Sequence, residues 1–355
     1  MPMLNYLYNL ATDRSQGFKA SVLKFILYIL SLIYGLIVMI VMFICSFRQY
    51  RANCKVISVG NITLGGTGKT PLVEFLARHL RDKGHRVAII TRGYKLKGAG
   101  GSKPDTALAD EPVMLQQKLG DIPVIVDVNR QRAIKSAVNK ACDTVILDDG
   151  FQQWKIKKDL EIVAIDSNNP FGNSWMLPRG ILRQPLATLK YADIFVLTKA
   201  NIQPPPKELK RRLARLNPHA VISEAAHQPA GFYEINQPQK LLSGDYFQGK
   251  SVALLSAIAD PAYFERSILD MGIKAGLSFQ FPDHYEYPRQ VLENIIREAK
   301  RKNIGVIITT EKDAVKLNKT GIADHGLPVV VFRVELKIIK YEEGLLNRLS
   351  RIYRA

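Results

Sequence analysis

Cysteine is scarce in this sequence of 355 residues. Only Cys45, Cys54 and Cys142 occur, and no two of them have CxxC spacing. This set excludes a disulfide framework and a zinc site built on paired cysteines, and it fits a reducing cytoplasm. Internal repeats and low-complexity tracts are also lacking. At this length, we therefore expect two ordinary globular domains.

Acidic residues are few compared with basic ones: 32 Asp and Glu stand against 50 Lys and Arg, for a net charge of +18. Such a balance predicts an anionic partner, which could be nucleic acid, an acidic membrane surface or a phosphorylated substrate. The aromatic residues of a nucleic-acid stacking platform do not accompany the basic ones, so we favour acidic lipid and expect no nucleic acid. No feature indicates an obligate protein partner. The basic residues expected near the ligand are Arg92, Lys95, Lys97, Lys103, Arg130, Arg132, Arg179 and Arg183.

One stretch lacks charge altogether. The 23 residues from Phe25 to Phe47 are uncharged and mostly apolar. As a helix they would extend roughly 34 Å, which is enough to cross a bilayer core. The run is too long for a signal peptide, and no small-residue cleavage site follows it. It is either a transmembrane anchor or a helix that lies in the membrane surface or docks on the protein; we favour membrane contact.

A glycine-rich turn stands between an apolar strand at 55–59 and a helix predicted from Thr70 to Arg81. Its glycines let backbone N–H groups surround phosphate oxygens, and the helix dipole favours an anion there. Lys69 would reach the β- and γ-phosphates, and Thr70 would ligate Mg²⁺. The alternative is a tight turn with a chance GKT. The predicted phosphate-binding loop consists of Thr63, where the general pattern has Gly, with Leu64, Gly65, Gly66, Thr67, Gly68, Lys69 and Thr70.

Short apolar strands alternate with helices from residue 55 to 200, which predicts a P-loop NTPase-like parallel sheet with helices on both faces. Ligands of such sheets bind at the carboxyl ends of the strands. Cytoplasmic ATP on this loop would also set the orientation of the protein at the membrane, because both flanks of the apolar run are basic. The expected strands are 55–59, 86–91, 123–126, 144–147, 161–165 and 194–197, and polar residues end five of them: the P-loop, Thr91-Arg92, Asp148-Asp149, Asp166 and Thr198-Lys199.

A proline-rich, basic segment at 203–215 interrupts this pattern, and a second, smaller α/β domain follows. Its expected strands are 251–255, 276–281 and 305–309, with helices at 261–271 and 288–302. The extended stretches 220–235 and 328–338 could pair as a two-stranded hinge. We therefore predict an N-terminal membrane-associated helix at 1–50, a kinase domain at 51–219, a hinge ribbon at 220–239 and 328–340, the smaller domain at 240–327 and a C-terminal helix at 341–355.

Several acidic residues and one histidine are candidates for chemistry. Asp148 ends an apolar strand, as a Walker B carboxylate does, and would hold Mg²⁺. The alternative for Asp148 is a cap of the turn after the strand, which is common; we favour the Mg²⁺ role because of the P-loop. Asp149 would orient the metal or act as a base. From the residues alone, Asp110 before a helix is more simply a helix cap. His284, in a loop of the second domain, is more simply a solvent-exposed hydrogen-bonding residue.

Taken together, the motifs resemble those of the tetraacyldisaccharide 4′-kinases, the lipid A 4′-kinases of Gram-negative bacteria. The resemblance implies two α/β domains joined by a β-ribbon, at the cytoplasmic face of the inner membrane. It also implies transfer of the ATP γ-phosphate to the 4′-hydroxyl of a tetraacylated glucosamine disaccharide 1-phosphate. The shared motifs are VGNITLGGTGKTP (59–71), TRGY (91–94), DEP (110–112), LDDGFQ (147–152), PFGN (170–173) with LPRGILRQP (177–185), FPDHY (281–285) and TTEKD (309–313).

The resemblance also assigns roles to residues. Asp110 acts as the base toward the sugar hydroxyl, His284 partners it, and closure of the second domain would complete the site. Asp148, Asp149 and Gln152 match the metal and phosphate motif. Two departures are Gln153, where the family has His, and Gln184, where it has Glu. The candidate substrate residues are Arg92, Tyr94, Asn173, Arg179 and Arg183.

Two other functions use the same loop. A membrane-tethered ATPase switch of the targeting or partition type has a Lys before the two glycines, where this chain has Leu64. A GTP-binding protein reads guanine through T-K-x-D, whereas this chain has Asn201 in place of the Asp. Neither function needs an acid–base pair on a second domain.

Overall fold

A computed structural model describes residues 10, 13, 16–92, 110–201, 204–283, 285–322 and 326–354. The chain forms two compact units. The first contains residues 1–92, 121–227 and 336–355, and the second contains residues 93–120 and 228–335.

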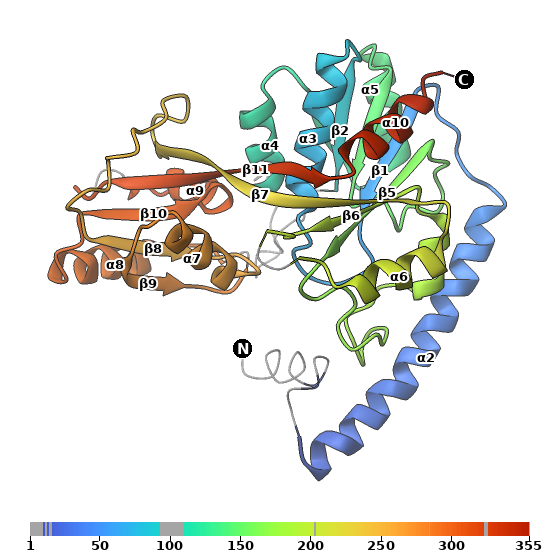
Figure 1. The fold of residues 1–355 in the computed structure, drawn as a ribbon, viewed down its shortest axis with the longest axis horizontal. Helices are drawn as coiled ribbons and strands as arrows, with labels where there is room; N and C mark the ends of the chain where they lie inside the picture. Colours follow the sequence, from blue (N-terminus) through green and yellow to red (C-terminus); the bar gives the residue numbers. More distant parts are fainter. Residues whose placement is uncertain are drawn as a thin grey trace, which may run out of the picture. The chain divides into compact units, whose positions relative to one another are not determined.

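The first unit is built on parallel strands in the order β3-β2-β4-β1-β5-β6-β7. Helices cover both faces of this sheet (Figure 1). Central strands of such a sheet are buried on both faces, which is why they are short, continuous apolar runs. The predicted fold class and its strands are confirmed. The strands are β1 (Lys55–Gly60), β2 (Val87–Thr91), β3 (Val124–Val126), β4 (Thr144–Asp148), β5 (Leu160–Asp166), β6 (Ile194–Thr198) and β7 (Val221–Glu234).

The helices around this sheet include one that the sequence did not predict. Residues 203–215 were expected only to interrupt the pattern, but α6 (Lys207–Leu216) is a helix with Leu209 and Leu213 buried. Prolines 204–206 come directly before its first turn, where proline does not disrupt a helix. Its basic residues lie on the faces of the helix that are not buried. The remaining elements are α3 (Lys69–Asp82), α5 (Arg130–Asn139), the short 3₁₀-helix η1 (Leu186–Tyr191) and α10 (Glu342–Arg351).

The apolar segment near the N-terminus forms the single long helix α2 (Phe18–Ser46), which is long and apolar enough to cross a membrane. A narrow stripe is buried, and it includes the small residues Ala20, Ser31 and Gly35. Tyr34 donates a hydrogen bond to the Arg183 carbonyl oxygen at 3.0 Å, and Tyr28 packs edge-on against Trp175. The rest of the helix surface is apolar and exposed. The helix is therefore docked by one stripe and leaves a wide apolar surface uncovered.

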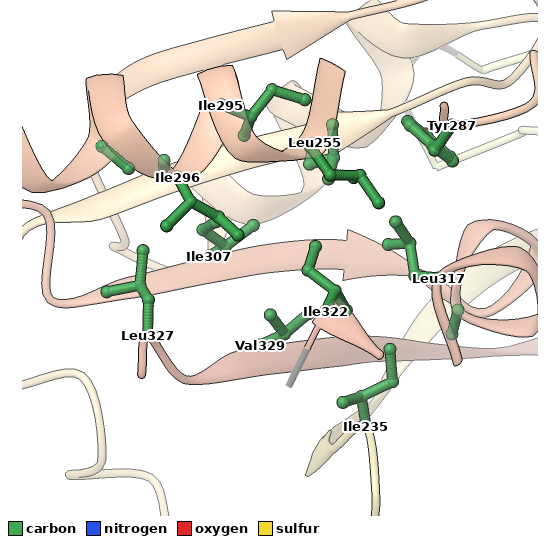
Figure 2. Packing of buried hydrophobic residues seen from close by; sticks show 14 of the residues in the cluster. Ile235, Leu255, Tyr287, Ile295, Ile296, Ile307, Leu317, Ile322, Leu327 and Val329 are labelled. Carbon is green, nitrogen blue, oxygen red and sulfur yellow. The ribbon is translucent and has the colours of Figure 1, made fainter. Parts of the chain in front are cut away.

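The second unit has parallel strands in the order β11-β10-β8-β9. Leu255, Ile307 and Val329, from three adjacent strands, pack with Ile295 and Ile296 of a covering helix (Figure 2). The opposite sheet face has its own apolar cluster. The elements are α4 (Asp110–Leu119), β8 (Val252–Ser256), α7 (Pro261–Asp270), β9 (Ala275–Gln280), α8 (Arg289–Arg301), β10 (Val306–Thr310), α9 (Glu311–Asn318) and β11 (Val329–Lys340).

Two features of this unit differ from the sequence-based outline. Helix α4 clusters with the second unit, although its residues fall within the range expected for the kinase domain. Helix α9 was not predicted and begins inside the TTEKD motif. Its first turn is acidic, and this composition favours a helix N-terminus, but the segment is only eight residues long and resembles a loop in sequence.

Strands β7 and β11 each pass from one unit to the other and are neighbours in the strand order (Figure 1). Ser223 Oγ donates to the Tyr341 carbonyl oxygen at 3.1 Å, and Ile235 N donates to the Val329 carbonyl oxygen at 3.0 Å. Between these two contacts the residue numbers rise along β7 and fall along β11, so the two strands are antiparallel. These strands coincide with the stretches predicted to form a ribbon; their role as a hinge remains a prediction.

The core in Figure 2 predicts which substitutions destabilise the second unit. Ile307 is fully buried between strands and helices. Ile307→Ala removes apolar atoms and leaves a cavity, so we expect a loss of ~2–5 kcal/mol in the free energy of unfolding. Leu269→Ala on α7 of the same unit, where the side chain is 49% exposed, is the control and should cost less than about 1 kcal/mol. Urea denaturation measures both; equal losses would contradict this core.

Candidate active site

The glycine-rich loop connects β1 to α3 in the first unit. Gly65 and Gly68 have positive φ values of 106° and 73°, a conformation that glycine adopts without steric cost. Gly68 is the N-cap of α3 and provides no side-chain cap, so the first backbone N–H groups of the helix remain available to a ligand. Leu64, Gly65 and Gly66 are exposed. The loop therefore has the conformation and the open surface of an anion site.

A second segment runs beside this loop. Leu64 N donates to the Ile181 carbonyl oxygen at 2.8 Å, and Arg183 N donates to the Ile62 carbonyl oxygen at 2.7 Å. Thr63 and Leu182 form the antiparallel bridge between them. This pairing involves Thr63, the position at which the general pattern has Gly. It also holds Arg183 next to the loop.

Asp149 is the centre of a charged network at the end of β4. Arg183 donates two hydrogen bonds of 2.9 Å to its two carboxylate oxygens, and Lys69 Nζ lies 3.5 Å from Oδ1. Burial by itself would raise the pKa of Asp149, but Arg183 and Lys69 outweigh it and lower the pKa to about 2. A carboxylate held this way is a weak proton acceptor. The geometry therefore favours an orienting role over the role of base.

Asn61 connects this network to the phosphate loop. Its side-chain oxygen accepts from Lys69 Nζ at 3.1 Å and also from Arg183, while its backbone oxygen accepts from Arg183 at 2.9 Å and Gln152 at 2.8 Å. Sequence reasoning missed this residue. The same signal that identified the acidic residues would have found it, because Asn61 is a polar residue directly after an apolar strand.

Asp148 and its neighbours supply oxygen ligands of the kind that Mg²⁺ prefers. Asp148 is buried and accepts from Thr91 Oγ1 at 3.2 Å, and Arg130 donates to its carbonyl oxygen at 3.0 Å. Gln152 Oε1 is buried and has no hydrogen-bond partner among the residues that the structure describes. Thr70 lies half-buried in the first turn of α3. Asp148, Gln152 and Thr70 are thus an all-oxygen set that fits Mg²⁺.

The structure places the remaining predicted site residues in different surroundings. Arg92 is exposed after β2, whereas Arg179 and Asn173 both bind Asp13 near the start of α2. Arg132 forms a surface pair with Asp127. Gln153 is half-buried near the site, and Gln184 is buried. Lys199 and Asp166 pair at 2.7 Å at neighbouring strand ends. Tyr94, Lys95, Lys97, Lys103 and His284 lie outside the described residues, and Asp110 is described only as the first residue of α4.

The parallel sheet, the phosphate loop with its lysine and the acidic end of the adjacent β4 define the class of protein: a P-loop nucleotide-binding protein. A family model, Tetraacyldisaccharide-1-P 4′-kinase, matches residues 23–353. The tetraacyldisaccharide 4′-kinases of Halothermothrix orenii and Desulfatibacillum aliphaticivorans are each 34% identical, over 94% and 95% of both chains respectively. The chain belongs to the tetraacyldisaccharide-1-P 4′-kinase family.

A solved structure agrees with this assignment. The crystal structure of the "apo" form of LpxK from Aquifex aeolicus in complex with ATP has a TM-score of 0.73 and 26% identity. The match covers 93% of this chain and 99% of that one. The chain is a kinase of lipid A biosynthesis that transfers phosphate to a hydroxyl group. The predicted family, fold class and enzyme class are confirmed.

The Asp149 network predicts a pH-dependent loss of stability in Arg183→Met. Because the folded-state pKa of about 2 lies below the ordinary value of about 3.9, ionised Asp149 adds stability above pH 4 that disappears as pH falls toward 2. We expect Arg183→Met to unfold more easily than the wild type by about 1–2 kcal/mol at pH 7, with the difference shrinking below pH 4.

Arg132→Met is the matched control, because Arg132 also forms two hydrogen bonds to one carboxylate, Asp127, but the arginine itself is 74% exposed. Because solvent around the exposed Arg132 screens this pair, Arg132→Met should lose much less stability at pH 7 than Arg183→Met. Chemical denaturation between pH 7 and pH 3 measures both variants. A difference between Arg183→Met and the wild type that stays constant with pH would argue against this role for Asp149.

The phosphate loop predicts a separate effect for Gly68→Ala. An added Cβ would lie 3.0 Å from His227 Nε2, and the positive φ adds strain. Desolvation and the Lys199 charge lower the pKa of His227 to about 4, so this neighbouring ring is neutral at pH 7. We expect at least a tenfold loss of nucleotide affinity. Gly84→Ala, with a φ of 88° and open space, should lose only stability. Calorimetric titration distinguishes them, and equal affinities would contradict the prediction.

Proposed function

We propose that this chain binds MgATP on the phosphate-binding loop at 63–70 and transfers the γ-phosphate to the 4′-hydroxyl of a tetraacylated glucosamine disaccharide 1-phosphate. The observation that carries the proposal is the Lys69–Asn61–Asp149–Arg183 network beside an open phosphate loop. The relative from Aquifex aeolicus, crystallised with ATP, supports the donor. The family description supports the acceptor.

The chain's own residues have distinct tasks in this proposal. Backbone N–H groups of the loop and Lys69 bind the phosphates, and Lys69 with Arg183 stabilises the negative charge on the transferring phosphoryl group. Asp149 keeps these two cations in place. Thr70, Asp148 and Gln152 would hold Mg²⁺, which would neutralise phosphate charge when bound. Positioning and electrostatics supply most of the rate.

The proton of the acceptor hydroxyl needs a base. We assign this role to Asp110, with His284 as its partner, on the strength of the DEP and FPDHY motifs. The 4′-oxygen forms a bond to the γ-phosphorus, the bond from that phosphorus to the β–γ bridging oxygen breaks, the hydroxyl proton passes to the Asp110 carboxylate, and ADP leaves. Asp149 is unsuited to this task, because both of its oxygens are engaged by Arg183.

Helix α2 suits an acylated substrate. Its exposed surface carries many large apolar residues, such as Phe25, Phe43 and Ile44, each more than 60% exposed. Burial of such a surface in the acyl region of a bilayer is favourable. The proposed location is therefore the cytoplasmic face of the inner membrane, where ATP and acylated substrate are both accessible. We propose neither nucleic acid nor an obligate protein as a partner.

The test uses the full-length protein in detergent, with ATP labelled at the γ-position and purified disaccharide acceptor. We expect labelled lipid from the wild type, and a fall in kcat of ~10²–10⁴-fold in Asp110→Asn and His284→Ala, because these remove the base or its partner. Asp245→Asn, at an exposed carboxylate of the second unit, should retain full turnover.

Three results would contradict parts of the proposal. ATP hydrolysis at the same rate with and without acceptor, with no labelled lipid, would favour a nucleotide switch. Preference for GTP would exclude ATP as the donor. Full turnover of Asp110→Asn with an unchanged pH profile would exclude Asp110 as the base.

A further inference from the structure

The TTEKD motif, residues 309–313, has no role in the reaction proposed so far. In the second unit it ends β10 and begins α9. Thr310 is the N-cap: Asp313 N donates to its Oγ1 at 3.2 Å, and that hydroxyl donates to Asp313 Oδ2 at 2.8 Å. Asp313 is fully buried and also accepts from Ala257 N at 3.0 Å and the Tyr287 hydroxyl at 3.2 Å. The first turn of α9 is thus fixed on both sides.

Lys312 projects from this fixed turn and contacts two other motifs of the same unit. Its Nζ lies 2.9 Å from Asp283 Oδ1 and 3.4 Å from Glu111 Oε1. The lysine side chain is only 17% exposed. Burial by itself would lower the pKa of Lys312, but Glu111 and Asp283 outweigh it and raise the pKa, so the side chain is charged at neutral pH.

Both partners of Lys312 are next in sequence to a residue of the proposed acid–base pair. Glu111 directly follows Asp110 in the DEP motif, and Asp283 directly precedes His284 in the FPDHY motif. We propose that Lys312 is a positioning residue for phosphoryl transfer, which ties the segment of the base to the segment of its histidine partner. This inference rests on the proposed roles of Asp110 and His284. A shift of a reacting group by about 1 Å can cost ~100-fold in rate, so such a tie is significant for catalysis.

A purely structural role for Lys312 is a weaker explanation. Helix α4 is already joined to α9 by Lys118 near its other end, where Nζ lies 3.0 Å from Glu311 Oε2 and both side chains are 9% exposed. That buried pair holds the two helices together without Lys312. Lys312 acts instead at the end of α4 that begins with Asp110.

The positive charge of Lys312 leads to a second expectation, which concerns the pH dependence of the rate. Two other charged groups of α9 have partners of their own: Glu311 binds Lys118 and Arg333, and Lys316 donates to the Tyr285 carbonyl oxygen at 3.0 Å. Lys312 is a cation that offsets the charges of Glu111 and Asp283. Without Lys312, this cation is lost from the carboxylates of Glu111 and Asp283, which are next in sequence to the proposed base and its partner. Their negative charge should raise the pKa values of both groups, which moves the acid limb of the pH–rate profile upward.

The experiment compares Lys312→Met with Lys118→Met in the kinase assay on the full-length protein. Both remove a lysine that joins α4 to α9, but only Lys312 contacts the two motifs. For Lys312→Met we expect kcat to fall ~10–100-fold with KM for ATP nearly unchanged, and the acid limb to move to higher pH. Lys312→Arg should recover most of kcat. Lys118→Met should lower Tm but keep the wild-type pH profile.

Two further variants make the result decisive. In an Asp110→Asn background, Lys312→Met should reduce kcat little further, because it acts through the same base. If Lys312→Met does not fold, Glu111→Gln/Asp283→Asn removes the ion pairs with little change of shape and should show the same fall in kcat.

The outcomes distinguish the positioning role of Lys312 from the role of Asp110 as the base. Loss of turnover in Asp110→Asn, together with wild-type kcat and pH profile in Lys312→Met, would overturn the positioning role and leave the proposed function intact. Fully additive losses in the double variant would also overturn it. Full turnover of Asp110→Asn would overturn the base assignment itself, and this inference with it.

Discussion

The Asp149 carboxylate is the interaction on which the nucleotide side of this molecule depends. It binds Lys69 from the phosphate loop and Arg183 from the segment that runs alongside that loop. Through Asn61, the same cations reach the end of β1. Asp149 is partly buried, so moving away from either cation would leave an uncompensated charge, which costs free energy. The carboxylate therefore has little freedom to move. In the proposed function, this rigidity preorganises the loop for phosphate.

Arg183 extends this constraint toward the membrane helix. Its side chain binds Asp149, while its carbonyl oxygen accepts a hydrogen bond from Tyr34 of α2. One residue therefore connects the proposed phosphate site to the element that carries the largest exposed apolar surface. Lys312 has a comparable position in the second unit, where one cation contacts two acidic residues from separate motifs. In both units, part of the positive charge of the chain is used internally to order acidic residues.

Much of the fold could be predicted because its signals are local. Short apolar runs ending in polar residues indicated the parallel strands, and the glycine-rich loop indicated the phosphate site. Helix α6 escaped prediction because prolines precede it, and α9 because it has only eight residues; burial of Leu209 and capping by Thr310 decided the outcome. The placement of α4 with the second unit depends on contacts with α9 that are distant in sequence.

By itself, then, the sequence determined the class of fold, the phosphate loop, the acidic strand end, the apolar helix and the family. Such features follow from residue type and spacing along the chain. The tertiary structure decided which charged residues are partners: Arg183 joins Asp149, Arg179 instead binds Asp13, and Lys312 meets Glu111 and Asp283. Ion pairs of this kind join residues far apart in sequence. Their energy depends on distance and burial, which only the folded chain defines.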